Sequence, residues 1–175
     1  MSKFTDNASE KLLVVAGKIS NQKHMASIKN AFYTLMPVIL TGAFCTLISN
    51  VVCSTTTTGI SLAKLPGMSW LGMFTDLFTA ANYATLNFFT VAAVFLIGME
   101  LAKQNGLGDS PDSGVVAVCS FISVLPTYVV TTVNDVQVTV PNVLGKDYTA
   151  ARGLFLGMVI ALVSVEIYSK FVKSH

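Results

Sequence analysis

Residues 77–99 read LFTAANYATLNFFTVAAVFLIGM, a run of 23 residues without a charged side chain. Asp76 precedes the run and Glu100 follows it. As an α-helix the run would be about 35 Å long, which exceeds the roughly 30 Å hydrocarbon core of a bilayer. Lipid offers no hydrogen-bond partner to the backbone, so a helix that satisfies its own amides is the expected structure. The stretch therefore predicts a transmembrane helix.

The composition of the whole chain also indicates a membrane protein. Of its 175 residues, 53% are hydrophobic and only 11% are charged, and the mean hydropathy is +0.65. Ordinary globular domains carry about a quarter charged residues, so this chain lacks the charge for a water-facing surface. The net charge of +2 is small, and five of the 11 lysines and arginines precede residue 30. The positive residues follow membrane topology, and they do not indicate nucleic-acid binding.

Three further apolar runs complete a predicted all-α integral membrane protein with about four transmembrane helices. Pro37 is expected to kink the first of them, and Pro126 is expected to end the third early, because proline removes a helix hydrogen bond. The four predicted spans, in chain order, lie near residues 31–52, 77–99, 113–132 and 153–168.

Residues 1–29 are expected to form a separate cytoplasmic segment ahead of the membrane part at residues 30–175. Apolar side chains recur there at helical spacing between lysines, which predicts a basic amphipathic helix on the membrane surface. A solvated leader that only supplies positive charge is the alternative, and the sequence leaves both open. His24 lies at the end of this segment, where no second ligand or carboxylate accompanies it in the sequence, so it is expected to be a surface residue.

Alternating residues follow the third apolar run. The stretch TYVVTTV at 127–133 is followed by Asn134 and Asp135 and then by VQVTV at 136–140. Alternation with a period of two on both sides of a turn predicts a small β-hairpin. We expect the hairpin to lie outside the cell, beyond the membrane.

Small residues line one edge of the last span. Gly153, Gly157 and Ala161 recur at intervals of four, which lets another helix approach closely. This edge is the predicted helix-packing site, and either a helix of the same chain or a second copy would fill it. Further along, Glu166 and Lys170 stand four residues apart and are expected to pair at the membrane surface.

The span at 77–99 has one polar side, formed by Asn82, Tyr83, Asn87 and Thr90. Such residues in a membrane face other protein or water. Hydrogen bonding between helices is favoured here over contact with a polar solute, although no other stretch of the chain is better suited to touch one.

No catalytic, cofactor or metal motif accompanies these spans. The chain contains no glycine-rich phosphate loop, no Ser/His/Asp set and no cluster of Cys and His. Its three cysteines, Cys45, Cys53 and Cys119, stand singly in apolar or threonine-rich surroundings and are expected to be packing residues. The sequence therefore predicts no catalytic residue, no metal site and no cofactor.

The distribution of lysine and arginine predicts the orientation. If the N-terminus is cytoplasmic, eight of the 11 positive residues fall in cytoplasmic segments and three fall in outer loops. Both chain termini are therefore expected in the cytoplasm.

Several stretches in succession resemble a known family. They are KNAFYTLMP at 29–37, FFTVAAVFLIGMELA at 88–102, GLFLGM at 153–158 and SVEIY at 164–168. In this order they resemble the membrane permease component, enzyme IIC, of the bacterial phosphoenolpyruvate-dependent sugar phosphotransferase system. Within it, the lactose, cellobiose and chitobiose family is the best match, and the resemblance covers nearly the whole chain.

The resemblance implies a protein of the bacterial cell membrane that imports cellobiose or a related β-disaccharide. The sugar would be presented to the partner IIB, whose phosphocysteine phosphorylates it and is itself recharged through IIA. Such permeases look like homodimers of ten-span chains, with dimer contacts in the N-terminal helices and the sugar site in the C-terminal half.

That C-terminal half has no counterpart in these 175 residues, so the substrate-binding residues are unknown. Neither His24 nor His175 matches the family's sugar-site histidine in context. The expected function is therefore that of the N-terminal portion of a permease, incomplete and inactive alone. A free-standing four-helix membrane scaffold or assembly partner without transport activity is the alternative.

Overall fold

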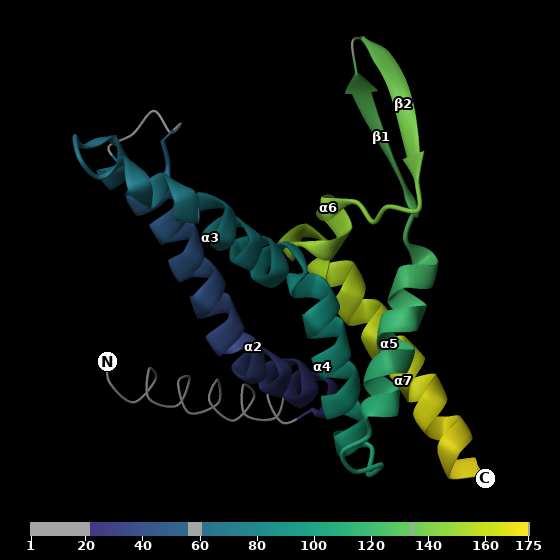
Figure 1. The fold of residues 1–175 in the computed structure, drawn as a ribbon. Helices are drawn as coiled ribbons and strands as arrows, with labels where there is room; N and C mark the ends of the chain where they lie inside the picture. Colours follow the sequence, from purple (N-terminus) through teal and green to yellow (C-terminus); the bar gives the residue numbers. More distant parts are fainter. Residues whose placement is uncertain (1–21, 56–60, 134, 175) are drawn as a thin grey trace, which may run out of the picture.

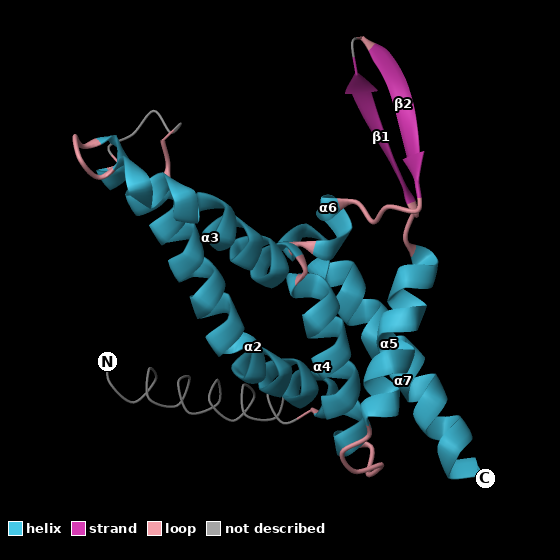
Figure 2. Ribbon diagram, viewed as in Figure 1, coloured by secondary structure: helices cyan, strands magenta, loops and turns pink. Residues whose placement is uncertain are grey.

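The computed structural model describes residues 22–55, 61–133 and 135–174, and Figure 1 traces their path. Helices make up most of it, and Figure 2 shows one β-hairpin standing apart from them. Residues 1–21, which hold most of the predicted amphipathic segment, lie outside the described residues.

The first long helix starts earlier than the sequence suggested. Helix α2 spans Lys23–Leu47 and continues as a π-helix, η1, over Ile48–Cys53. The predicted start near residue 31 is corrected to Lys23, because the residues before the apolar run continue the same helix. Pro37 lies inside α2. The combined stretch Lys23–Cys53 is long and apolar enough to cross a membrane.

The run at 77–99 is not one continuous helix, which corrects the prediction. It is divided among α3 (Thr75–Asn82), a π-helix, η4 (Tyr83–Asn87), and α4 (Phe89–Gln104). The two parts are bent by 43° at Phe88. The Thr85 hydroxyl donates to the carbonyl oxygens of Ala81, at 2.8 Å, and Asn82, at 3.2 Å. Side chains that bond back to helix carbonyls favour bending at such a point.

The third predicted span is shorter than expected. Helix α5 covers Pro111–Val124 and ends two residues before Pro126, as expected from that proline, so residues 125–132 of the predicted range 113–132 are not part of the helix. Its 14 residues are about 21 Å long, less than the thickness of a hydrocarbon core. Ser110 and Pro111 occupy the N-cap and first-turn positions, where proline costs no hydrogen bond.

The hairpin occupies the alternating stretch. Strand β1 (Tyr128–Val133) pairs antiparallel with β2 (Val136–Pro141), in a register that runs from Val133 opposite Val136 to Tyr128 opposite Pro141. Asp135 in the turn has a φ of 61°, a left-handed conformation that Asp adopts more readily than most residues.

The last helix is longer than the predicted range 153–168. Short helices α6 (Lys146–Thr149) and η5 (Ala151–Gly153) lead into α7 (Leu154–Ser174). The stretch Ala151–Ser174 is long and apolar enough to span. Two further short helices, η2 (Leu62–Lys64) and η3 (Ser69–Phe74), connect η1 to α3.

The described residues therefore contain two helices that can span a membrane by length and composition, or three if the bent pair counts as one crossing. The predicted number of four spans is not reached on these criteria, because α5 is too short and the second run is broken. Figure 1 places the α2–α3 connection and the hairpin at one end of the helices, and the α4–α5 turn and the C-terminus at the other.

Helix α4 lies at the centre, in contact with α2, α5 and α7. Ile97 and Leu101 of α4 are fully buried. The same core includes Ala31 and Leu35 from α2, Ala117 and Phe121 from α5, and Ala161 and Val165 from α7.

The edge of small residues on the last helix lies against the same chain. A Cβ atom at Gly157 would come within 2.7 Å of Val94 Cγ2 and 2.9 Å of Thr90 Cγ2, both on α4. Ala161 is fully buried, and a side chain at Gly153 would overlap the backbone oxygen of Tyr148. The absence of a side chain at Gly157 thus allows α7 to approach α4 closely.

The three cysteines are unpaired thiols. Cys45 and Cys53 are buried, which agrees with the expected packing role. Cys119 is exposed and does not fit that role within this chain.

Candidate functional site

The polar side chains singled out on the second run do not meet in one site. Asn82 faces α2, where its amide donates to the Thr46 hydroxyl. Tyr83 is exposed and stacks edge-on against Phe88, with ring centroids 5.6 Å apart. The buried Thr90 hydroxyl instead donates to the backbone oxygen of Ala150 at 2.6 Å. The break at Phe88 separates Asn82 from Thr90.

The Thr90 hydrogen bond gives a testable prediction. Replacing Thr90 with valine keeps the shape of the side chain but leaves the Ala150 carbonyl without its hydroxyl partner. We expect the free energy of unfolding to fall by about 1–2 kcal/mol, measured by denaturant titration in mixed micelles.

The control for this prediction is Thr34→Val. The Thr34 side chain is exposed and bonds only to its own helix, at 3.1 Å from the Asn30 oxygen. Equal losses in the two variants would contradict a specific role for the bond between Thr90 and Ala150.

Asn82 instead belongs to a cluster that we call the polar notch, a cavity of about 190 Å³ between the end of α2 and α3. It is lined by Thr46, Ser49, Asn50, Thr79 and Asn82, all of which are neutral and polar. The notch lies at the same end of the helices as the α2–α3 connection.

Hydrogen bonds within the polar notch use one N–H group of each asparagine amide. Asn50 donates to the Thr46 carbonyl at 2.9 Å, and Asn82 donates to the Thr46 hydroxyl. The Thr46 hydroxyl in turn donates to the Gly42 carbonyl at 2.8 Å. The hydroxyls of Ser49 and Thr79 lie 3.3 Å apart. Among the described residues, nothing donates to the amide oxygens of Asn50 or Asn82, so both remain available as acceptors.

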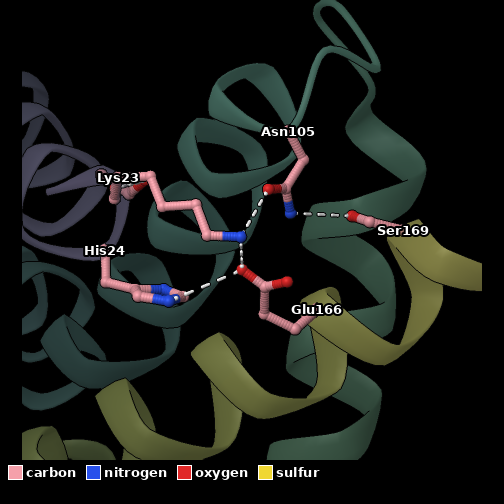
Figure 3. A network of polar contacts seen from close by, with 6 residues as sticks. Lys23, His24, Asn105, Glu166 and Ser169 are labelled. Carbon is pink, nitrogen blue, oxygen red and sulfur yellow. Dashed lines mark hydrogen bonds and ion pairs between the residues drawn. The ribbon is translucent and has the colours of Figure 1, made fainter.

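A second polar group, which we call the clasp, consists of Lys23, His24, Asn105, Glu166 and Ser169 (Figure 3). Lys23 Nζ is 2.5 Å from Glu166 Oε1 and donates to Asn105 Oδ1 at 3.1 Å. Asn105 Nδ2 donates to Ser169 Oγ at 3.2 Å, and His24 Nε2 lies 3.7 Å from Glu166 Oε1. The clasp therefore joins the start of α2 and the end of α4 to α7.

The clasp corrects two predictions. Glu166 pairs with Lys23 and not with Lys170, and His24 does have a carboxylate neighbour. Both corrections arise because α2 begins at Lys23 and its first turn lies beside α7. The side chains of Lys23 and Glu166 are 44% and 25% exposed, so water screens this ion pair in part.

The ion pair and the amide hydrogen bonds of the clasp connect three helices, which is the arrangement of a structural contact. Nδ1 of His24 is buried and has no hydrogen-bond partner among the described residues. Within residues 22–55, 61–133 and 135–174, no three His, Cys, Asp or Glu side chains are placed to hold a metal ion.

The described residues thus form a bundle of apolar helices, two or three of which can span a membrane by length and composition, around a central helix, with a polar notch and a charged clasp. This arrangement defines a membrane protein, and comparison with known proteins identifies its family. The chain belongs to the "Phosphotransferase system, EIIC" family, whose model matches residues 29–175. This match confirms the predicted resemblance to enzyme IIC of the sugar phosphotransferase system.

Three relatives show the extent of the similarity. The oligo-beta-mannoside-specific EIIC component of Bacillus subtilis is 27% identical and covers 97% of this chain. The cellobiose-specific EIIC component of Geobacillus stearothermophilus is 25% identical and covers 100%. The crystal structure of the transporter ChbC, the IIC component from the N,N'-diacetylchitobiose-specific phosphotransferase system, is 26% identical, with a TM-score of 0.75 over 94% of this chain.

The chain spans little more than a third of the length of these proteins. It covers 36% of the Bacillus protein, 38% of the Geobacillus protein and 37% of the ChbC chain.

Proposed function

We propose that these residues form the N-terminal membrane part of a sugar permease for cellobiose or a related β-disaccharide. The observation that carries the proposal is the likeness to ChbC over nearly the whole chain, in fold as well as in sequence. The relatives named for oligo-beta-mannosides and for cellobiose support the choice of a β-linked sugar.

The main sugar site is proposed to lie in the remaining length of the permease, which these residues do not cover. Phosphorylation of the sugar then belongs to the partner IIB, supplied through IIA, and this chain performs no chemistry itself. The clasp supports this division of roles between the permease and IIB. Its charged groups, Lys23 and Glu166, pair with each other and so hold helices together.

The proposed orientation places both termini and the α4–α5 turn in the cytoplasm. The hairpin and the polar notch then lie toward the outer side. The excess of lysine and arginine at the ends of the chain supports this orientation. The working permease is proposed to be a homodimer in the bacterial cell membrane.

Sugar uptake tests the proposal. In cells that lack related permeases but contain IIA and IIB, this chain alone is expected to give only background uptake of labelled cellobiose. A chimera is expected to restore uptake, with this chain replacing the matching N-terminal part of the Geobacillus cellobiose protein. The full Geobacillus protein serves as the positive control.

The two arms fail in different ways. Uptake by this chain alone at the rate of the full relative would contradict the placement of the main sugar site. An inactive chimera that is inserted in the membrane and retains its fold would contradict the assignment of these residues to a permease.

A further inference from the structure

Two π-helical segments border the polar notch. Ser49 and Asn50 belong to η1, and η4 begins immediately after Asn82. π-Helical turns are rare, and they occur frequently at functional sites because they open the regular hydrogen-bond ladder. Because η1 lies against α3 and η4 lies against α2, the notch is bordered by one departure from regular geometry in each of the two helices.

The polar notch keeps both donors and acceptors of hydrogen bonds, which suits a hydroxyl group because a hydroxyl donates as well as accepts. Each asparagine amide uses one of its two N–H groups within the protein, so one N–H group and the oxygen of each amide are left for an incoming molecule. The hydroxyls of Ser49 and Thr79 accept as well as donate. No charged side chain lines the notch, so its complement is a neutral molecule rich in hydroxyl groups.

Hydrocarbon is a poor occupant of this space. Burying free amide oxygens against lipid leaves them unsatisfied, at a cost of several kcal/mol each. The notch volume equals the liquid volume of about six water molecules, enough for a small hydrated polar group. A sugar ring that enters this space can form hydrogen bonds to the notch residues through its own hydroxyl groups.

We propose that the polar notch binds the hydroxyl groups of a β-linked disaccharide on the outer side of the membrane. The inference rests on the proposed function for the class of sugar and for the side of the membrane. The contact is additional to the main sugar site in the remaining length of the permease. Asn50, Asn82 and Thr79 supply the acceptors that recognise the hydroxyls.

Direct binding tests the inference without transport. The full 175-residue chain is placed in lipid nanodiscs, and saturation-transfer NMR measures its contact with cellobiose. Permethylated cellobiose is the matched ligand control, because it keeps the sugar skeleton but has no hydroxyl donor. We expect a signal with cellobiose and none with the permethylated sugar.

A paired variant tests the position of the site. Asn50→Leu together with Thr79→Val removes two acceptors while nearly preserving side-chain volume, and we expect binding to weaken about tenfold. Thr41→Val is the control, because Thr41 is exposed on the same helix and bonds only to its own Pro37 oxygen, at 2.8 Å. Circular dichroism verifies that both variants keep their helices.

Three results would overturn the inference. They are the lack of any cellobiose signal with the unmodified chain, equal signals from the two sugars, and full binding by a folded Asn50→Leu, Thr79→Val variant. The comparison of the two sugars needs no substitution, so it decides the matter even if the paired variant misfolds. None of these results would affect the uptake expected of the chimera.

Discussion

Replacing Gly157 with leucine is expected to destabilise the chain by about 3 kcal/mol, since overpacking a well-packed core costs typically 1–3 kcal/mol and occasionally more. Even a single Cβ atom would lie 2.7 Å from Val94 and 2.9 Å from Thr90. Those two neighbours are β-branched and fully buried, so neither can rotate aside. Helix α7 would have to move away from α4, which lies at the centre of the core.

Unfolding in mixed micelles, followed by circular dichroism, measures this loss. Val163→Leu is the matched control, because it also enlarges a side chain on α7 but at a position that is 55% exposed. The control is expected to unfold like the unmodified chain. An unfolding midpoint unchanged in Gly157→Leu would show that the close approach of the two helices is not needed for stability.

Reversing the charge at Glu166 is expected to cost about 2 kcal/mol, a figure discounted for solvent screening. In the unmodified chain, Lys23 Nζ lies 2.5 Å from the Glu166 carboxylate. Glu166→Lys replaces that carboxylate with a second ammonium group. It also removes the negative group near His24. The start of α2 would lose its main polar attachment to α7.

The charge swap tests whether the pair itself matters. Lys23→Glu combined with Glu166→Lys should recover about half of the lost stability, because the opposite charges meet again in a different geometry. Lys170→Glu should have little effect, since Lys170 is not the partner of Glu166 here. A loss in Lys170→Glu as large as that in Glu166→Lys would restore the i, i+4 pair that the sequence suggested.

The sequence predicted that the chain is mostly helical and where the apolar helices fall, because long runs without charge have few alternatives in a membrane protein, but it did not predict their bounds or the break in the second run. The alternation at 127–133 and 136–140 likewise falls where β1 and β2 pair. The break at Phe88 could not be predicted from the sequence, because it follows the segment η4, which is in contact with the distant helix α2. A Cβ atom at Gly42 of α2 would lie 2.5 Å from the Thr85 hydroxyl, so the lack of a side chain at Gly42 lets the two segments approach this closely.

The polar clusters were harder to predict than the helices. Asn82 stood out in the sequence, but its partner Thr46 lies on a different helix, and nothing in the spacing connects them. Lys23 and Glu166 lie near opposite ends of the chain. Lys170, four residues after Glu166 on the same helix, was the local partner expected from i, i+4 pairing. Pairing between distant segments follows from the packing of α2 and α7 on the same central helix, α4, which a single sequence does not reveal.

The β-hairpin has a consequence for handling the protein. Five of its valines, Val130, Val133, Val136, Val138 and Val140, are between 39% and 62% exposed, and its outer strand edges carry backbone groups with no neighbouring strand among the described residues. Such edges template intermolecular strand addition, which leads to aggregation. Pro141 lacks a backbone N–H and blunts the edge of β2 at one end only. We therefore expect concentrated preparations of this chain to aggregate through the hairpin, even when detergent covers the apolar helices.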